Sequence, residues 1–269
     1  MHPICNKKLF LLDMDGTLYL GNELFPQTLP FLESVHTRGG RCIYITNNSS
    51  KSVDAYVQKL GRLGISATVQ DFLTSSQATA RYLRKAYPGT LFYVLGTHSL
   101  KNELTQSGVA VTDQLTDGIG GLVMGFDTEL TFRKLEDACK LLLRDIPYIA
   151  TNPDWVCPTE FGYVPDCGSV STMLKNATGK WPKFIGKPEP EMIFLAMEKT
   201  GCTPAETIVI GDRIYTDIAS GLNAGVSTAL VLSGETTPEI LQASAQKPEF
   251  VFDSVGDIAA LLQTEPAKP

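Results

Sequence analysis

Two carboxylates early in the chain have the spacing that metal binding or acid–base chemistry needs. Asp13 and Asp15 lie two residues apart in the stretch Asp-Met-Asp-Gly-Thr, directly after an apolar run, 8–12, that predicts a short buried strand. In open α/β sheets the carboxyl ends of the strands face the ligand crevice. Two nearby negative charges repel each other unless a cation or a proton lies between them. The pair therefore indicates a hard metal such as Mg²⁺, an acid and a nucleophile, or both, with a plain Asp-Gly turn as the alternative.

Polar residues of matching character follow three further apolar runs. They are Thr46 and Asn47 after the predicted strand 42–45, Lys187 after the short run 184–185, and Asp212 and Asp217 after the predicted strand 207–210. Because the carboxyl ends of parallel strands lie along one edge of a sheet, these side chains are expected to converge with the two N-terminal carboxylates.

The residue types in this set suit phosphoryl transfer. One carboxylate can attack phosphorus and form an aspartyl-phosphate, and a second can protonate the leaving oxygen. A hydroxyl, an amide and an ammonium can hold the phosphoryl oxygens and offset charge in the transition state. The remaining carboxylates can anchor Mg²⁺.

Each feature alone has a simpler explanation. Thr46-Asn47-Asn48 could be a helix N-cap and turn, Lys187 an exposed lysine in a Gly-Lys-Pro loop, and Asp212 and Asp217 caps or solvated loop acids. The order and placement of all of them together favour one phosphoryl-transfer site.

Apolar runs that predict strands alternate with patterns that predict helices, which is typical of a parallel sheet with right-handed crossovers. Strands are predicted at 9–13, 42–45, 207–210, 229–232 and 250–252, and helices at 27–38, 53–63, 190–199 and 219–224. Gly21-Asn22 between apolar neighbours predicts a hairpin over 18–25. The sequence thus predicts an α/β fold with a Rossmann-like, doubly wound parallel sheet.

A middle segment, 78–179, repeats this rhythm by itself. Its predicted strands are 91–95, 122–125 and 148–150, and its predicted helices lie near 98–106 and 131–144. Because it separates two sets of site-like residues, we expect it to be an inserted second α/β domain. Residues 1–77 and 180–269 then form the first domain.

The bulk composition excludes several classes of partner. The chain has 269 residues, 43% hydrophobic and 19% charged, with a net charge of −6 and no long basic run, which argues against nucleic acid or an acidic membrane as the main partner. Six scattered cysteines show no zinc spacing, so reduced thiols are expected. No apolar run is long enough to cross a bilayer, and the predicted location is cytoplasmic.

The combined motifs resemble the haloacid dehalogenase (HAD) superfamily of phosphatases. The resemblance lies in 13–17, in Thr46-Asn47 at a strand end, in Gly186-Lys187-Pro188 and in 211–217, and it covers the chain from about Leu9 to the last helix. The insert, with its stretch Thr-Asn-Pro-Asp at 151–154, resembles the NagD-like group, also called the 4-nitrophenyl-phosphatase group or subclass IIA. This resemblance implies a HAD-like catalytic core with an α/β cap domain at 78–179.

The resemblance also implies catalytic roles. Asp13 would be the nucleophile that forms an aspartyl-phosphate, and Asp15 the general acid and base. An acid at position 15 implies that water is activated, so a hydrolase is expected rather than a long-lived phosphoenzyme.

Further roles concern binding. Thr46 and the Asn47 backbone would bind phosphate, and Lys187 would neutralise the charges of Asp13 and the phosphoryl group. Mg²⁺ would be held by Asp13, the Asp15 backbone carbonyl and Asp212, with Asp217 holding the metal shell by ligation or hydrogen bonding.

In this group the cap supplies the leaving-group pocket. The candidates are Asn152, Asp154, Trp155, Asp166 and Cys167. Asp166, if it points inward, would add a negative charge that favours cationic or hydroxyl-rich substrates. Trp155 would be either part of the cap's core or a stacking surface.

The resulting prediction is a Mg²⁺-dependent phosphomonoesterase that acts on small phosphorylated metabolites such as sugar phosphates, nucleoside monophosphates and 4-nitrophenyl phosphate. The alternatives are a phospho-acceptor signalling domain, a regulatory binding protein with a vestigial site, and a phosphomutase. The resemblance also implies a homodimer that pairs through the cap.

Overall fold

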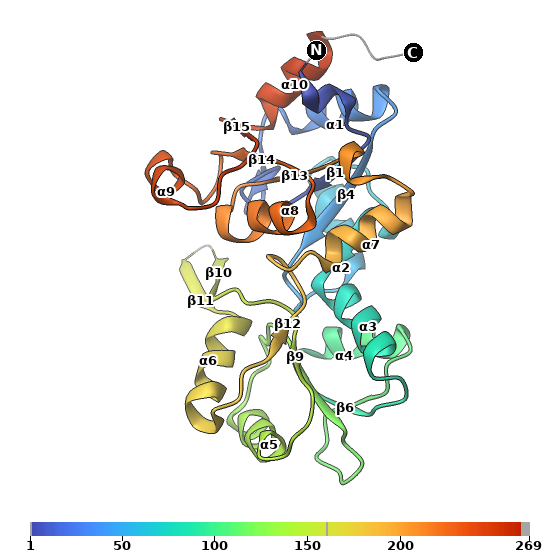
Figure 1. The fold of residues 1–269 in the computed structure, drawn as a ribbon, viewed down its shortest axis with the longest axis vertical. Helices are drawn as coiled ribbons and strands as arrows, with labels where there is room; N and C mark the ends of the chain where they lie inside the picture. The colour runs from blue at the N-terminus through green and yellow to red at the C-terminus, as the bar shows by residue number, and fades with distance from the viewer. Residues whose placement is uncertain (1, 160, 265–269) are drawn as a thin grey trace. The chain divides into compact units, whose positions relative to one another are not determined.

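A computed structural model of the chain describes residues 2–159 and 161–264. Its contacts divide the chain into two compact units. Unit 1 consists of the residues up to Thr46, Tyr56–Leu73 and those from Lys187 onward, and unit 2 consists of Asn47–Ala55 and Thr74–Gly186. Each unit contains its own parallel sheet with helices packed on it (Figure 1).

Unit 1 is built on a six-stranded sheet with the order β15-β14-β13-β1-β4-β5. β1 is central and pairs in parallel with β13 on one side and with β4 on the other. The strands are β1 (Leu9–Leu12), β4 (Arg41–Thr46), β5 (Phe72–Thr74), β13 (Thr207–Gly211), β14 (Ser227–Val231) and β15 (Phe250–Phe252). β1 and β13 are buried along their whole length, as expected for parallel strands covered on both faces.

The order of these strands defines where a ligand should bind. From β1 the chain runs outward through β4 and β5 on one side, and β13, β14 and β15 run outward on the other. The strand order therefore reverses between β1 and β13, and in open α/β sheets such a switch point opens a crevice at the carboxyl ends of the strands.

Helices cover the sheet of unit 1 in pairs. α1 packs against α10, and α7 packs against α8. The helices and helical turns are η1 (Pro3–Asn6), α1 (Thr28–Thr37), α2 (Val53–Arg62), η2 (Val69–Asp71), α7 (Glu191–Thr200), η3 (Pro204–Glu206), η4 (Ile214–Ile218), α8 (Ala219–Ala224), α9 (Pro238–Ala243) and α10 (Val255–Thr264). The hairpin of β2 (Tyr19–Leu20) and β3 (Glu23–Leu24) follows β1.

Unit 2 has a five-stranded sheet with the order β12-β9-β8-β6-β7 and parallel pairing throughout. Its strands are β6 (Phe92–Leu95), β7 (Val111–Thr112), β8 (Gly121–Met124), β9 (Tyr148–Ala150) and β12 (Lys183–Phe184), beside an antiparallel hairpin of β10 (Val156–Thr159) and β11 (Gly162–Pro165). The helices α3 (Ser75–Ala86), α4 (His98–Gln106), α5 (Phe132–Leu142) and α6 (Cys167–Thr178) complete it. Its core joins the inner side chains of β6, β8 and β9 to α5 and α6.

The predicted fold class is confirmed: both units are α/β, and the sheet of unit 1 is of the Rossmann-like type. The predicted hairpin over 18–25 forms with Gly21-Asn22 at its turn. The structure also contains β5, α3, the β10–β11 hairpin and α6, which were not predicted. A signal for α3 was present, because Thr74 and Gln77 form a capping box at its start.

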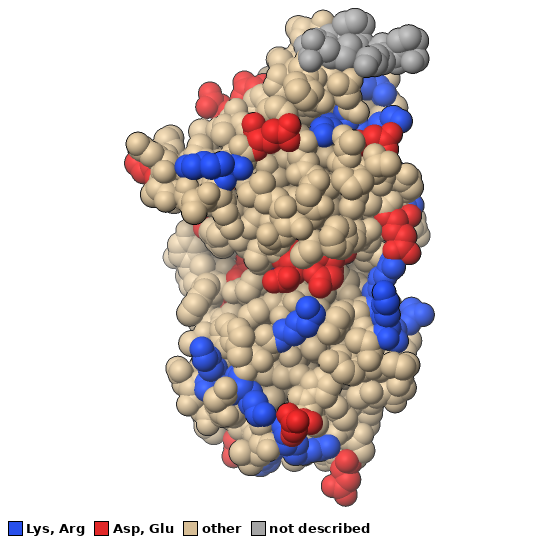
Figure 2. Space-filling view, in the orientation of Figure 1, with Lys and Arg blue, Asp and Glu red and all other residues tan. Residues whose placement is uncertain are grey.

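Two further observations concern membrane-spanning helices and basic surfaces. No helix in the described part of the chain is long and apolar enough to cross a membrane. On the face drawn in Figure 2, the lysine and arginine side chains that are coloured lie in separate groups rather than in one continuous basic surface.

We expect the central strand to dominate the stability of unit 1. Leu11 is fully buried on β1, so Leu11→Ala should lower the free energy of unfolding by about 3 kcal/mol, through lost apolar burial and the cavity that remains. Leu20→Ala removes the same atoms from an exposed hairpin position and should have little effect. Urea denaturation of both variants measures the difference, and equal losses would contradict it.

Candidate active site

A buried ammonium group connects two carboxylates at the carboxyl edge of the sheet of unit 1. Lys187 Nζ donates to Asp13 Oδ1 and to Asp217 Oδ1, both at 2.6 Å, and its side chain is 4% exposed. Asp13 directly follows β1, and its backbone N–H donates to the carbonyl of Ile210 on β13 at 2.9 Å. The ammonium therefore lies at the predicted switch point of the sheet.

Asp217 reaches this edge through an irregular turn. It lies in η4, a π-helical turn between β13 and α8, and its Oδ2 accepts the backbone N–H of Arg213 at 3.1 Å. A Cβ at Gly211 would lie 2.4 Å from the Cβ of Asp217, so only glycine fits at the end of β13. Such π-turns are frequent at functional sites.

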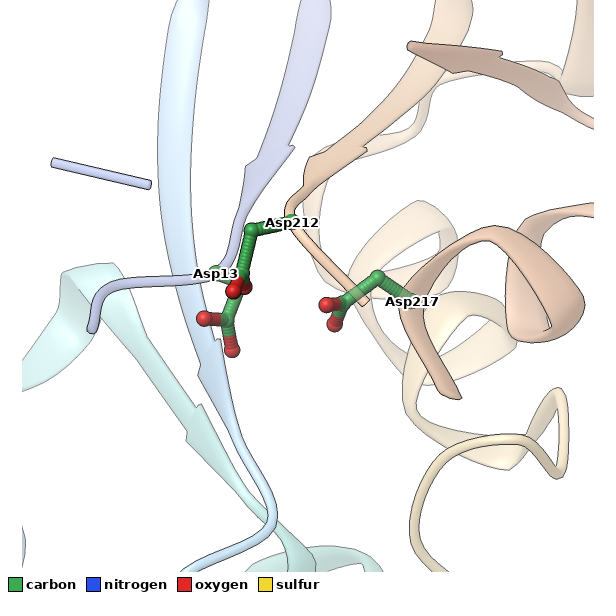
Figure 3. Close-up of side chains that lie close together, drawn as sticks. All are labelled: Asp13, Asp212 and Asp217. Atoms are coloured by element: carbon green, nitrogen blue, oxygen red, sulfur yellow. The ribbon is translucent and has the colours of Figure 1, made fainter. Parts of the chain in front are cut away.

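Asp212 supplies the third carboxylate. Its Oδ2 accepts the backbone N–H of Glu235 at 2.7 Å, while its buried Oδ1 has no hydrogen-bond partner among the described residues. Side-chain oxygens of Asp13, Asp212 and Asp217 lie within 4.8 Å of one another, and Figure 3 shows their carboxyl groups turned toward a common space. Such a cluster of carboxylates is typical of a site for a hard cation.

Two glycines make room for Asp212. A Cβ at Gly234 would lie 2.1 Å from Asp212 Oδ2, and a Cβ at Gly16 would lie 2.4 Å from the same atom. Gly16 also has a φ of +85°, a conformation that strains any other residue. The Asp-Gly pair after β1 is therefore a turn, and it also provides space for a carboxylate that comes from β13.

Burial and mutual repulsion shift the titration of this cluster. The pKa of Asp212 is raised to about 8, mainly by burial and further by the charges of Asp13 and Asp217. Burial also raises the pKa of Asp217, although the Lys187 ammonium opposes that shift. Burial by itself lowers the pKa of Lys187, but the carboxylates of Asp13 and Asp217 outweigh it, so the pKa rises and the ammonium stays charged.

Asp15 lies beside this cluster in a different environment. Burial raises the pKa of its carboxyl group, and the ammonium of Lys59 opposes the rise. Lys59 Nζ lies 3.8 Å from Asp15 Oδ2 and 4.0 Å from the centre of the Tyr19 ring. A partly exposed carboxyl group with a raised pKa is suited to donate and accept a proton.

Thr46 and Asn47 lie at the end of β4, and both are buried. Thr46 belongs to unit 1 and Asn47 to unit 2. Asn47 Nδ2 donates to Asp154 Oδ2 at 2.7 Å. These two residues do not cap α2, because Ser52 Oγ accepts the backbone N–H of Ala55 at the start of that helix.

Four of the predicted specificity residues are buried inside unit 2. Asn152 Nδ2 donates to Asp154 Oδ2 at 2.8 Å and to Asp166 Oδ1 at 3.2 Å. Asp166 also caps α6 by accepting the backbone N–H of Cys167, whose side chain lies in the hydrophobic core. The carboxylate of Asp166 thus stabilises the start of a helix, and its contact with a substrate stays a prediction.

Trp155 differs from these residues because its side chain is 61% exposed. The view of Trp155 as part of the cap's core is therefore wrong. Phe161, between β10 and β11, and Tyr163, on β11, are also exposed.

Two of the simpler explanations of the core motifs are also wrong. Lys187, Asp212 and Asp217 are all buried, which excludes an exposed loop lysine and solvated loop acids.

Two parts of the site, the loop after β14 and Lys59, were not predicted from the sequence. The loop after β14 brings Gly234 and the backbone of Glu235 to Asp212, and Lys59 approaches Asp15 from α2. A Ser-Gly-Glu-Thr stretch after an apolar run was a signal for the first. Lys59 had none, because a lysine on an amphipathic helix usually faces solvent.

Comparison with known families agrees with this geometry. Residues 10–110 match the family model described as haloacid dehalogenase-like hydrolase, and residues 184–258 match a HAD-hydrolase-like model. This chain belongs to the haloacid dehalogenase-like hydrolases. The resemblance read from the motifs is thereby confirmed.

Three relatives place the chain within the superfamily. An acid sugar phosphatase of Staphylococcus aureus is 33% identical over 95% of this chain and 98% of its own length. The crystal structure of a 4-nitrophenylphosphatase from Thermotoga maritima is 39% identical, covers 98% of this chain and 100% of its own, and has a TM-score of 0.93. A glycerol phosphate phosphatase from Mycobacterium tuberculosis, solved with magnesium, is 28% identical over 100% of this chain and 82% of its own, with a TM-score of 0.90. The protein is a phosphatase of the NagD-like, 4-nitrophenyl-phosphatase group.

The raised pKa of Asp212 predicts that, in the absence of metal, the free energy of unfolding depends on pH. Its folded pKa is about 8, against an ordinary value of 3.8, so stability falls as the pH rises through this interval. Asp212→Asn keeps the shape without the charge, and we expect its melting temperature in EDTA to exceed that of the wild type by more at pH 8 than at pH 5. Thermal melts at both pH values measure this, and a difference that does not change with pH would contradict it.

Proposed function

We propose that this protein is a Mg²⁺-dependent phosphomonoesterase that hydrolyses small phosphorylated metabolites through an aspartyl-phosphate at Asp13. The observation that carries the proposal is the buried ammonium of Lys187, held at 2.6 Å from Asp13 Oδ1 and from Asp217 Oδ1. This contact fixes the side chain of Asp13 at the switch point of the sheet. The matches to phosphatases support the same conclusion.

The residues at this edge fit a magnesium ion. Asp212 Oδ1 is a buried carboxylate oxygen without a donor, so it is suited to be a direct ligand together with Asp13 and the backbone carbonyl of Asp15. Both oxygens of Asp217 accept hydrogen bonds, from Lys187 and from the Arg213 backbone, so Asp217 fits the supporting role better. When bound, the ion would screen the negative charges of the phosphoryl group and of Asp13.

The chemistry has two displacement steps at phosphorus. In the first, a carboxylate oxygen of Asp13 attacks phosphorus, the bond to the leaving oxygen breaks, and Asp15 donates a proton to that oxygen. In the second, Asp15 takes a proton from water, the water oxygen attacks phosphorus, and the acyl-phosphate bond breaks to release phosphate and restore Asp13. Thr46, the Asn47 backbone and Lys187 hold the phosphoryl oxygens in both steps.

Residues 1–77 and 180–269 form the catalytic core in this proposal, and residues 78–179 form the cap. The cap supplies the surroundings of the leaving group, with Trp155 as an exposed aromatic candidate for stacking. Sugar phosphates and 4-nitrophenyl phosphate are the first candidate substrates, because relatives are named for activity on sugar phosphates and on 4-nitrophenyl phosphate. Nucleoside monophosphates are further candidates, and pairing of two copies through the cap is part of the same proposal.

The nucleophile can be tested directly. We expect Asp13→Asn to reduce phosphate release from 4-nitrophenyl phosphate by roughly three orders of magnitude or more, because the amide cannot form the acyl-phosphate. Wild-type turnover should require Mg²⁺ and cease in EDTA. Phosphate release would be measured over a panel of sugar phosphates and nucleoside monophosphates, and turnover that persists in Asp13→Asn would contradict the proposal.

Replacing Asp15 should affect formation and hydrolysis of the aspartyl-phosphate differently. The 4-nitrophenolate group leaves readily without a proton, so Asp15→Asn should still form the aspartyl-phosphate from this substrate but hydrolyse it slowly. Rapid mixing should then show a burst of one nitrophenolate per enzyme, followed by slow turnover. With a sugar phosphate, whose alcohol needs the proton, both steps should slow. The absence of a burst, with slow formation of the first product, would contradict this division.

A further inference from the structure

Asn47, one of the two residues that bind phosphate in the proposed function, is anchored by a buried polar network of unit 2. Asn47 belongs to that unit, although its neighbour Thr46 belongs to unit 1. Asn47 Nδ2 donates to Asp154 Oδ2 at 2.7 Å, and the Asn47 carbonyl accepts the hydroxyl of Ser75 at 2.7 Å. A Cβ at Gly186 would lie 2.4 Å from Asn47 Oδ1, so the amide also packs closely against the residue before Lys187.

Asp154 is itself held from the other side. Its Oδ2 also accepts Asn152 Nδ2 at 2.8 Å, and Asn152 Oδ1 accepts the hydroxyl of Thr151 at 2.8 Å. All of these side chains are buried. Hydrogen bonds to an ionised acceptor are stronger than neutral ones, and low exposure to water strengthens them further. The network therefore defines one position for the side chain of Asn47.

We propose that Asp154 is a positioning residue for phosphate binding: it fixes Asn47, and through Asn47 the Thr46-Asn47 peptide group. This inference rests on the proposed function. The side chain, the carbonyl carbon and the backbone nitrogen of Asn47 are all bonded to one Cα, so holding the first two leaves the nitrogen little freedom. A planar peptide group then joins that nitrogen to Thr46 at the end of β4. A donor that is already ordered loses less entropy when it binds an anion. Asp154 touches neither the substrate nor the metal in this proposal.

A double-mutant cycle of Asn47→Ala and Asp154→Ala tests the inference. Each single variant should weaken the binding of inorganic phosphate, measured by calorimetry with Mg²⁺, and raise the KM for 4-nitrophenyl phosphate by roughly tenfold, the order expected for one lost charge-assisted hydrogen bond. The double variant should be no worse than either single variant, because both remove the same contact. The kcat should change little, since a contact that binds phosphate equally in the ground and transition states affects KM alone.

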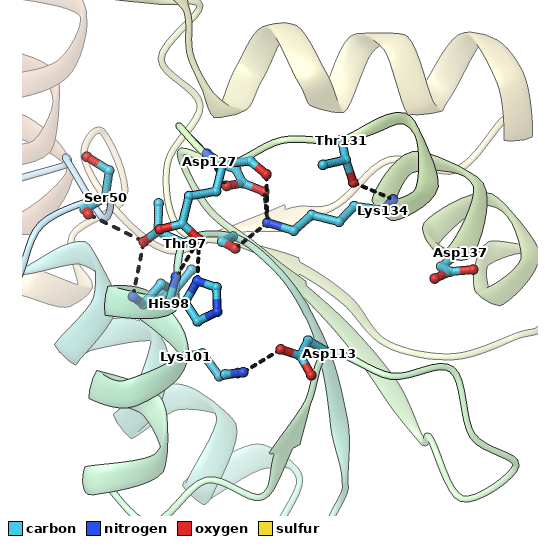
Figure 4. A network of polar contacts seen from close by, with 12 residues as sticks. Ser50, Thr97, His98, Lys101, Asp113, Asp127, Thr131, Lys134 and Asp137 are labelled. Carbon is cyan, nitrogen blue, oxygen red and sulfur yellow. Dashed lines mark hydrogen bonds and ion pairs between the residues drawn. The ribbon is translucent and has the colours of Figure 1, made fainter.

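Two further variants keep the test informative if Asp154→Ala folds poorly. Asp154→Asn retains one carbonyl oxygen that can accept the Asn47 amide, so its loss should be smaller than that of Asp154→Ala. Asp127→Asn is the matched control, because Asp127 is also a buried carboxylate of unit 2, paired with Lys134 at 2.8 Å in a separate network (Figure 4). It should lower thermal stability without changing phosphate affinity.

The outcomes separate the two proposals. Additive losses, or an unchanged KM and phosphate affinity in Asp154→Ala, in an enzyme whose wild type hydrolyses 4-nitrophenyl phosphate, would overturn the positioning role and leave the proposed function intact. A wild type that neither turns over the substrate nor binds phosphate would overturn the proposed function, and the positioning role with it.

Discussion

The unfavourable proximity of three carboxylates at one edge of a sheet is the constraint on which the rest of this site depends. Asp13, Asp212 and Asp217 converge within 4.8 Å, and one ammonium, Lys187, offsets part of their charge. With all four groups ionised, three negative charges and one positive charge leave an excess of two negative charges. Burial makes that excess costly. Burial and the two neighbouring carboxylates therefore raise the pKa of Asp212. A divalent cation would offset the excess, which is why an arrangement that is poor for stability is good for binding metal.

The protein tolerates this arrangement because its backbone is shaped around it. Gly16, Gly211 and Gly234 lie where a methyl group would collide with a carboxylate. Backbone N–H groups of Arg213 and Glu235 donate to Asp217 and Asp212 and supply hydrogen bonds that water would otherwise provide. These backbone donors come from the turns after β13 and β14, so the loops at the switch point also stabilise the carboxylates of the site. Close backbone approaches and buried charge are concentrated at the site, as expected for a functional centre.

The convergence of the carboxylates could be predicted from the sequence, because the carboxyl ends of parallel strands share one edge of a sheet. Asp13 directly follows β1 and Asp212 directly follows β13, so the two could be grouped without coordinates. The cap was less predictable. Asp154, Asp166 and Cys167 were proposed near a leaving group, and that role stays a prediction. Their burial and hydrogen bonds within unit 2 were not predicted, because the direction of a side chain in a loop depends on contacts that sequence spacing does not encode. Lys59 was missed for another reason: it lies on α2, and a lysine on an amphipathic helix usually faces solvent.

Along the chain, the first boundary between the two compact units falls between Thr46 and Asn47. Two adjacent residues that bind phosphate in the proposed function belong to different compact units, and the peptide bond between them cannot stretch. The hydrogen bond between Asn47 and Asp154 lies wholly within unit 2, as does the one between Asn47 and Ser75. Any ordering of the loop at 151–154 is thus transmitted through covalent bonds to the phosphate-binding residues. The insert can therefore influence phosphate affinity through its internal hydrogen bonds, in addition to any contact it makes with the leaving group.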